Sequence, residues 1–279
     1  MSRHTSLKVG GPVDLYAVPL DASDLQSLIH QLAEQQIPWL AIGRGYNLLV
    51  RDGGIRGAVI SLERFNRIEE LGDGRIRAEA GAENLTVVRF AQERGLGGIG
   101  FIAGIPGTVG GAVRMNAGAY GKGILEWTVC MTLMRAGNSA EFCIEQLEYG
   151  YRHLDLLPGD LVLAATLQLV PRDPAVTEEE IRKDLELRRS KHNVGHPSAG
   201  SFFKNPAGQA AWRLIDAAGM RGMQVGGAQV SEVHSNFLVN SGNATAADFL
   251  ALAAQVKAAV LEQSGVMLEE EVRIVGEEP

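Results

Sequence analysis

The pattern of apolar and polar residues divides the N-terminal part of the chain into short strands and one amphipathic helix. β-Branched and aromatic residues over 13–18 predict a strand, and apolar residues then recur at helical spacing until Pro38. Ser23 begins a capping box for that helix. Further strands are expected at residues 39–42, 48–50 and 58–62, followed by a hairpin over 68–80 with its turn at 72–74.

Helices and strands continue to alternate in the rest of the chain. Helices are expected over residues 84–94, 177–190, 207–218 and 245–264, and strands over 126–134, 161–170 and 266–275. Asn84 and the segment that starts at Thr177 are predicted caps. The last helix has the clearest signals, because Thr245 and Asp248 form a capping box and Gly265 stands at its end. There is no internal repeat and no low-complexity segment.

Length and composition exclude several classes of function. The 279 residues suit two or three small domains, and the formal charge of −7 argues against a nucleic-acid surface. No run reaches the ~18 apolar residues that span a bilayer, and no apolar signal segment follows Met1, so a cytoplasmic location is expected. Cys130 and Cys143 have apolar surroundings, lack zinc-site spacing, and are expected to be plain core residues. We expect no metal, no membrane and no obligatory protein partner.

A glycine-rich stretch, residues 104–121, is the most unusual part of the sequence. Such a stretch lets the backbone approach another molecule closely, and its N–H groups can form a concave site for a pyrophosphate. A surface loop is the alternative, but surface loops carry polar residues, and this stretch carries Ile105, Val109, Val113 and Met115. The composition therefore favours a loop packed inside the protein against a large, partly apolar, anionic ligand.

A second glycine loop, residues 43–47, resembles a dinucleotide-binding fingerprint only in part. Leu48 stands where the third glycine of Gly-x-Gly-x-x-Gly is required, and a strand follows instead of a helix. The loop is therefore either a phosphate site built from backbone N–H groups or a simple β-turn.

Residues 199–206 hold Ser201 between a glycine and two phenylalanines. The Gly-x-Ser-x-Gly pattern of hydrolases is absent. Next to Lys204 and Asn205 in an apolar pocket, Ser201 could give up a proton, although from these residues alone a turn serine is the favoured interpretation. The cations at 188–191 and the acids at 269–271 are each typical of a solvated face, and sequence parity does not say which glutamate is special.

Taken together, these stretches resemble the UDP-N-acetylenolpyruvoylglucosamine reductase family, whose members complete UDP-N-acetylmuramate in peptidoglycan synthesis. The matching segments are residues 9–12, 43–50, 104–112, 115–121, 151–152, 200–206 and 268–273. They occur in the family's order and cover nearly the whole chain. Tyr46 stands where the family usually has serine, and the short distance from Arg152 to the boundary at Pro171 leaves no room for the extra substrate-covering segment of longer members.

The resemblance implies an α+β fold with an FAD-binding region of the vanillyl-alcohol-oxidase type. Two subdomains, about 1–64 and 65–172, would hold FAD without a covalent bond. Residues 173–270 would form a C-terminal substrate-binding domain, and residues 271–279 would return as a strand to the FAD region. The implied FAD contacts are Gly43, Arg44, Gly45, Tyr46, Asn47, Leu48, Gly104, Ile105, Pro106, Gly107, Thr108, Gly110, Gly111, Ala112, Asn116, Ala117 and Gly118.

The resemblance also implies the chemistry. NADPH would reduce FAD, and the hydride would then pass to the enolpyruvyl double bond of UDP-N-acetylglucosamine enolpyruvate. Arg152 and a protonated Glu271 would stabilise the enolate, and Ser201 would protonate the carbanion. The implied substrate contacts are Tyr151, Lys191, Lys204 and Asn205.

Two other functions remain open at this level. A different flavin oxidase or dehydrogenase of the same fold would keep the FAD site without the chemistry of Ser201, Arg152 and Glu271. A flavin-binding or nucleotide-sugar-binding module would lack turnover altogether.

Overall fold

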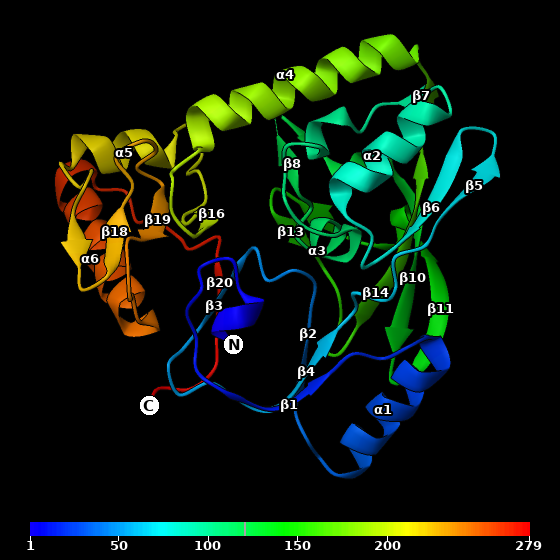
Figure 1. The fold of residues 1–279 in the computed structure, drawn as a ribbon, viewed down its shortest axis with the longest axis horizontal. Helices are drawn as coiled ribbons and strands as arrows, with labels where there is room; N and C mark the ends of the chain where they lie inside the picture. The colour runs from blue at the N-terminus through cyan, green and yellow to red at the C-terminus, as the bar shows by residue number, and fades with distance from the viewer. Residues whose placement is uncertain (120) are drawn as a thin grey trace. The chain divides into compact units, whose positions relative to one another are not determined.

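A computed structural model describes residues 1–119 and 121–279, apart from the side chains of Lys191 and His192 (Figure 1). The chain forms two compact units, and each is assembled from segments far apart in sequence. The first unit comprises Met1–Asp14, Arg44–Gly57 and Arg189–Pro279, and the second comprises Leu15–Gly43 and Ala58–Arg188. The predicted boundaries near residues 64, 172 and 270 follow family domains and not compactness, so they stay a prediction. Within the described part of the chain, no helix has the length and apolar character needed to cross a membrane.

The second unit is built on a five-stranded antiparallel sheet in the order β11-β10-β14-β6-β5. Its strands are β5 (Ile68–Gly72), β6 (Arg75–Glu79), β10 (Thr128–Arg135), β11 (Asn138–Cys143) and β14 (Leu161–Gln168). The predicted hairpin over 68–80 is confirmed as β5 and β6, with its turn at Asp73 and Gly74. β11 is an edge strand and is largely exposed.

Each face of this sheet has its own apolar core. Helices α2 (Asn84–Glu93) and α3 (Val109–Arg114) share one core with Met131 and Leu133. Helix α1 (Ala22–Glu34) covers the other face through Leu25 and Ile29. A small sheet in the order β1-β4-β2 contributes to the second core, with β1 (Val13–Ala17), β2 (Trp39–Ile42) and β4 (Ile55–Ser61).

Shorter elements complete the second unit. The β-pairs are β7 (Leu96–Gly97) with β15 (Val170–Pro171), β8 (Gly118–Ala119) with β9 (Lys122–Gly123), and β12 (Tyr149–Gly150) with β13 (His153–Leu154). The 3₁₀ turns are η2 (Gly100–Ile102), η3 (Ile124–Trp127) and η4 (Ile144–Gln146). The long helix α4 (Pro174–His192) follows β15, and its residues from Arg189 onward belong to the first unit. Arg135 and Asp160 pair in a bidentate manner at 2.8 and 2.7 Å, which fixes the turn end of the β10–β11 hairpin.

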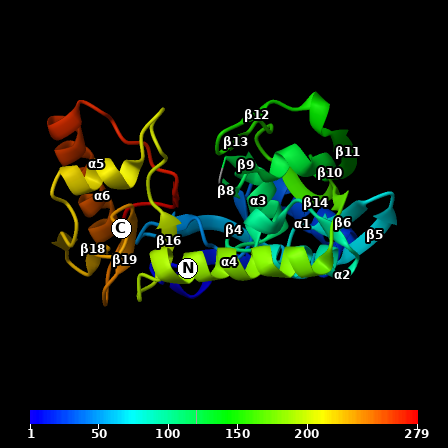
Figure 2. The same cartoon turned by 90° about the horizontal axis from the view of Figure 1, so that it is seen from above.

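The first unit contains a four-stranded antiparallel sheet in the order β16-β19-β18-β17. Its strands are β16 (Ser198–Ser201), β17 (Gln224–Val225), β18 (Ala228–Val230) and β19 (Phe237–Asn240). Helix α6 (Ala246–Ser264) packs on β17 and β18, and α5 (Ala211–Ala217) packs on α6 (Figure 2). β3 (Leu48–Val50) and β20 (Arg273–Val275) pair in parallel, and the 3₁₀ turn η1 (Ser2–His4) opens the chain.

The cap of α6 confirms the sequence prediction, whereas three other predicted caps are wrong. Thr245 accepts from the N–H of Asp248, and Gly265 ends the helix with φ 72°. α1 is capped by Asp21 and not by Ser23. α4 begins at Pro174, ahead of Thr177, and Asp173 accepts from the second N–H of that turn.

The third wrong prediction of a cap concerns α2, whose N-cap is Glu83 and not Asn84. Asn84 is the first helical residue, and its side chain is engaged outside the helix. The cysteine prediction is also wrong, because Cys143 is exposed and Cys130 is half-buried. Both lie on the outer hairpin of the large sheet.

Candidate active site

The glycine-rich stretch begins as a loop over 104–108 and continues as α3. Its backbone is held by the segment that follows β6: the N–H groups of Val109 and Gly110 donate to the carbonyls of Ala82 and Ala80 at 2.9 and 2.8 Å. Asn84 completes the anchor, because its backbone N–H donates to Gly107 and its side-chain amide donates to Ile105, at 3.1 and 3.0 Å. These bonds fix the loop to the second unit. Val109 and Val113 are buried, as the composition predicts, whereas Ile105 and Met115 are half-buried and Pro106 is exposed.

Three glycines of this stretch leave room that side chains would occupy. A Cβ built on Gly104, Gly107 or Gly111 meets no atom closer than 3.6 Å, and Gly107 has φ 146°. Gly110 differs, since a Cβ there would lie 2.8 Å from the Cβ of Ala80. Gly110 is required by the packing of α3 on the chain beneath it, whereas a Cβ at any of the other three glycines would make only ordinary contacts.

The two predicted glycine loops meet within the second unit at Gly43. A Cβ on Gly43 would lie 2.5 Å from the hydroxyl oxygen of Thr108, which is itself buried. The remainder of the loop over residues 43–47 belongs to the first unit. There Gly45 has φ 64°, and its missing Cβ admits the carbonyl of His4, so its glycine has a structural reason.

A buried asparagine organises the end of the glycine-rich stretch. Asn116 accepts from the N–H of Leu125 at 3.2 Å and donates to the carbonyl of Gly150 at 2.8 Å. The guanidinium of Arg152 donates to the backbone carbonyls of Asn116 and Gly118, at 3.4 and 3.0 Å. The predicted catalytic arginine thus lies directly on a predicted flavin-binding turn.

Backbone strain marks the same place. Asn116 and Arg152 have φ values of 41° and 55°, in the left-handed region that residues other than glycine rarely adopt. Such residues cluster at functional sites because the surrounding structure has to hold them there. The Arg152 guanidinium also lies 5.2 Å from the centre of the Tyr151 ring.

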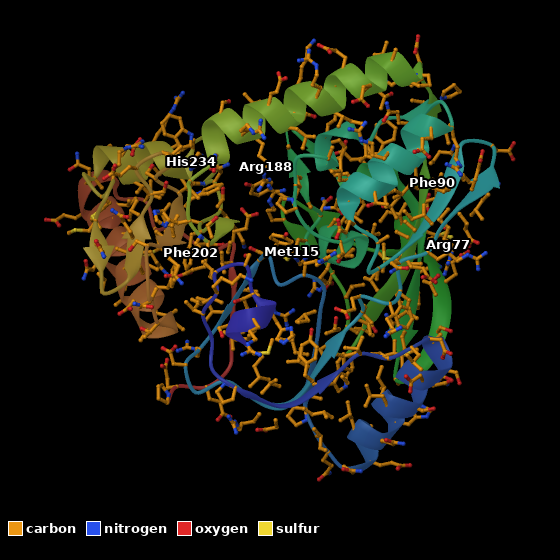
Figure 3. All side chains as sticks on the ribbon, in the orientation of Figure 1. Arg77, Phe90, Met115, Arg188, Phe202 and His234 are labelled. Carbon is orange, nitrogen blue, oxygen red and sulfur yellow. The ribbon has the colours of Figure 1, made fainter. Side chains whose placement is uncertain are left out.

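Near the C-terminal end of α4, Arg188 donates to the carbonyl of Gly104 (Figure 3). This bond joins the predicted cationic cluster to the glycine-rich loop inside the second unit. Lys191, the predicted substrate contact in that cluster, has its side chain outside the described residues.

In the first unit, Ser201 ends strand β16 and is half-buried. The next residue, Phe202, lies in the core of this unit (Figure 3), and its carbonyl accepts from the N–H of Glu271 at 2.8 Å. The following backbone continues this pairing, because Phe203 bridges to Glu270 and the N–H of Lys204 donates to Glu269. Ser201 and Glu271, seventy positions apart in the sequence, therefore lie on neighbouring segments.

The structure distinguishes the three successive glutamates. Glu269 pairs with Lys204 at 3.2 Å, and Glu270 pairs with Lys257 at 2.9 Å. Glu271 is half-buried, and its backbone carbonyl accepts from the side chain of Asn47 at 3.0 Å. Glu269 and Glu270 are thus both held in ion pairs with lysines.

The two remaining predicted substrate contacts have structural partners. Lys204 holds Glu269 in an exposed ion pair. The Asn205 side chain accepts from the N–H of Ala211 at 3.0 Å, which explains why α5 starts there and not at the predicted residue 207.

Sequence reasoning missed two asparagines. Asn236 is buried, and its amide accepts from the N–H and donates to the carbonyl of Phe203 at 3.0 and 2.8 Å. The sequence predicts Asn84 only as a helix cap, but its hydrogen bonds with Ile105 and Gly107 hold the glycine-rich loop. Its Oδ1 is buried without a hydrogen-bond partner among the described residues. A buried asparagine has no local sequence signal, because its partners come from distant segments.

Comparisons with known proteins agree with this arrangement. Residues 192–275 match the family model of the UDP-N-acetylenolpyruvoylglucosamine reductase C-terminal domain, and residues 13–136 match an FAD binding domain. The predicted fold class, an FAD-binding region followed by a C-terminal α+β domain, is confirmed.

Named relatives and a solved structure extend the match to the full chain. A UDP-N-acetylenolpyruvoylglucosamine reductase of Pelobacter propionicus is 74% identical over 100% of this chain and 94% of its own. One from Geotalea uraniireducens is 58% identical over 99% of this chain and 92% of its own. The crystal structure of UDP-N-acetylenolpyruvylglucosamine reductase from Thermus caldophilus matches with a TM-score of 0.85 and 33% identity, covering 100% of this chain and 97% of that one.

Proposed function

Because the chain belongs to the UDP-N-acetylenolpyruvoylglucosamine reductase family and is an FAD-dependent oxidoreductase, we propose that it converts UDP-N-acetylglucosamine enolpyruvate to UDP-N-acetylmuramate with NADPH as hydride donor. One observation supports the catalytic assignment most strongly. The N–H of Glu271 donates to the carbonyl of Phe202, so the predicted proton donor Ser201 and the predicted carboxyl group are neighbours within one unit.

We assign the cofactor's pyrophosphate to the glycine-rich loop. Gly104, Gly107 and Gly111 carry no side chain there, and Asn84 fixes the loop that carries them. Bound FAD supplies the hydride chemistry, and the protein supplies orientation and electrostatics. The remaining predicted FAD contacts, at 43–48, 105–112 and 116–118, complete the proposal, with Gly45 and Gly110 acting through the backbone packing described above.

Ser201 acts as the general acid in this proposal. Reduction of the enolpyruvyl group leaves a carbanion beside the carboxylate, and this carbon needs a proton. The strand position of Ser201 fixes its Cα, because β16 pairs with β19 at Phe237 and Glu271 pairs with the following residue. A hydroxyl held in this way can deliver its proton without reorganising the chain.

Arg152 and Glu271 stabilise the enolate before it is protonated. Arg152 carries a permanent positive charge, and two backbone carbonyls hold its guanidinium. Glu271 contributes a hydrogen bond from its protonated carboxyl group to the substrate carboxylate. Fixed donors of this kind stabilise developing charge best in a site without water.

The diphosphate and the sugar are assigned to Tyr151, Lys191, Lys204 and Asn205. The Lys204–Glu269 pair is exposed, with side chains 38% and 73% accessible. Exposed pairs of this kind contribute only about 0–1 kcal/mol. Lys204 can therefore release the Glu269 carboxylate and bind a substrate phosphate instead at little cost in free energy.

The visible spectrum of the purified protein tests this function. Flavin absorbance should bleach on adding NADPH without oxygen and return on adding UDP-N-acetylglucosamine enolpyruvate. Bleaching without recovery would indicate a different flavin oxidase or dehydrogenase, and a yellow protein that NADPH leaves unchanged would indicate a binding module. Acid denaturation should release all the colour, since we propose that FAD is bound without a covalent bond.

A further inference from the structure

The two cysteines of the chain face each other across an antiparallel pair of strands. In the register of β10 and β11, Cys130 is the direct partner of Cys143, although the sequence places them in separate segments. Both are free thiols, Cys143 is exposed, and Cys130 is half-buried. This pair lies in the second unit and takes no part in the proposed reduction.

The position of the hairpin turn determines whether Cys130 and Cys143 are a hydrogen-bonded or a non-hydrogen-bonded pair. Ala136 and Gly137 form the turn, both with positive φ, and Arg135 and Asn138 close the ladder as a hydrogen-bonded pair. Such pairs alternate with non-hydrogen-bonded pairs, and Cys130 is an odd number of residues from Arg135. Cys130 and Cys143 therefore form a non-hydrogen-bonded pair, in which the Cα atoms lie about 4.5 Å apart and the side chains are closest.

An independent contact supports this assignment. In a non-hydrogen-bonded pair the N–H points away from the partner strand. The N–H of Cys143 does so, because it donates to the side-chain oxygen of Gln146 at 2.8 Å. A Cα separation of about 4.5 Å lies inside the range of 4.4–6.8 Å that disulfides span.

We propose that Cys130 and Cys143 form a dithiol modification site, which low-molecular-weight disulfides such as oxidised glutathione convert reversibly to an intramolecular disulfide. Its structural effect follows from its position. Arg135 and Asp160 already fix the turn end of the hairpin, whereas the exposed edge strand β11 ends at Cys143. The disulfide would fix the end of the β10–β11 hairpin that lies away from the turn.

The reaction proceeds by two exchanges. The exposed Cys143 thiolate attacks one sulfur of oxidised glutathione, the reagent's S–S bond breaks, and one glutathione thiolate leaves. The Cys130 thiolate then attacks the Cys143 sulfur and expels the second glutathione thiolate. Two protein thiols are oxidised, one reagent disulfide is reduced, and the two protons pass to the released glutathione.

The environment of Cys130 favours this order of attack. Burial raises the pKa of the Cys130 thiol, and the neighbouring Glu141 and Cys143 raise it further, while a hydrogen bond with Thr166 lowers it. Cys130 is therefore the slower nucleophile, and the exposed Cys143 reacts with the reagent first.

Intact-mass measurement of the holoenzyme tests the site. After oxidised glutathione treatment, denaturation and alkylation, the wild type should be two hydrogens lighter, with neither thiol alkylated. Cys130→Ser should instead retain one glutathione, and Cys143→Ser should remain largely a free thiol. A stable glutathione adduct on wild-type Cys143, a disulfide-linked dimer, or two alkylated thiols would each overturn the proposal.

Two further measurements do not depend on the variants. Phenylarsine oxide, which bridges two adjacent thiols, should stay bound to the reduced wild type when challenged with a monothiol, and loss of the arsenical would contradict the geometry. Amide hydrogen exchange in β11 should slow on oxidation and recover with dithiothreitol. Unchanged exchange in a protein shown to hold the disulfide would refute the proposed fixing of this strand.

Discussion

The side-chain amide of Asn47 donates a hydrogen bond of 3.0 Å to the backbone carbonyl of Glu271, across 224 positions of sequence. The bond joins Asn47, in the glycine loop over residues 43–47, to the proposed catalytic glutamate. It lies next to the parallel pairing of β3 with β20, in which Leu48 is the partner of Arg273. The position of Glu271 therefore depends on the loop that is assigned to the flavin.

Asn47→Ala should lower turnover through Glu271. Losing one hydrogen bond of this kind costs about 0.5–1.5 kcal/mol, which corresponds to up to ~10-fold in kcat. Asn240→Ala in the same unit is a more severe control, because Asn240 donates to the carbonyl of Leu7 and also accepts from the N–H groups of Gly242 and Ala244. Steady-state kinetics with equal FAD content should show a loss for Asn47→Ala alone. Equal losses in both variants would indicate general destabilisation.

Glu271→Gln should retain more activity than Glu271→Ala. An amide can still donate a hydrogen bond to the substrate carboxylate, whereas a methyl group cannot. Glu270→Gln, in the neighbouring pair with Lys257, serves as the control and should leave kcat nearly unchanged. If Glu271 worked as an anion, its Gln and Ala variants would be equally poor in a kcat comparison.

Substitutions at two neighbouring glycines of α3 should affect different properties, FAD affinity at Gly111 and stability at Gly110. Gly111→Val adds an exposed side chain, which clashes with nothing in the protein, at the proposed cofactor site, and it should weaken FAD binding roughly 10–100-fold while the protein stays folded. Gly110→Ala pushes a methyl group against Ala80 and should lower the free energy of unfolding by about 1–3 kcal/mol. Flavin fluorescence titration and thermal unfolding separate the two effects. Full FAD affinity in folded Gly111→Val would remove this residue from the site.

The Arg135–Asp160 pair should make stability depend on pH. The hydrogen bond from Arg135 lowers the pKa of the buried Asp160 carboxyl below its unfolded value of about 3.9. Its stabilisation is complete above the unfolded pKa and is lost as the pH falls through the folded pKa. Asp160→Asn should therefore lower the free energy of unfolding by about 1–3 kcal/mol near neutral pH.

Urea unfolding at neutral and acidic pH measures this effect. The difference between Asp160→Asn and the wild type should shrink as the wild-type carboxyl takes up its proton. The exposed Asp155→Asn provides the control, with a small and constant difference expected. A constant large difference for Asp160→Asn would mean that packing, and not the charge, is responsible.

Local signals carried most of the fold prediction. The α6 cap depends on Thr245 and Asp248, three residues apart, and the β5–β6 turn depends on two adjacent residues, so both are readable from the sequence. The start of α2 is not, because the Asn84 side chain bonds to Ile105 in the folded chain. The tertiary contact with Ile105 therefore outweighs the local preference of asparagine for the N-cap position.

The candidate site shows the same division. The resemblance identified Ser201, Arg152 and Glu271 as candidates, because sequence parity could not separate Glu271 from its neighbours. In the folded chain Glu269 and Glu270 pair with Lys204 and Lys257, and the assignment of Glu271 continues to rest on the resemblance. The environment of Cys143 was misjudged for a related reason, since apolar sequence neighbours do not reveal that β11 lies at the edge of its sheet.

Ser201→Ala addresses the central assignment, that Ser201 protonates the substrate carbon. The variant should leave reduction of the flavin by NADPH nearly unchanged, because that step needs no proton from Ser201. Reduction of the enolpyruvyl group should slow by ~10²–10⁴-fold, the usual contribution of a general acid. Ser198→Ala, on the same strand, controls for damage to β16 and should affect neither step.

Stopped-flow absorbance of the flavin measures both steps in one protein. The Ser201→Ala enzyme is first reduced with NADPH and then mixed with UDP-N-acetylglucosamine enolpyruvate, and the return of flavin colour is followed in time. The account predicts a normal first phase and a second phase slowed by at least ~10²-fold. A second phase as fast as that of the wild type would contradict it and would assign the proton to another donor.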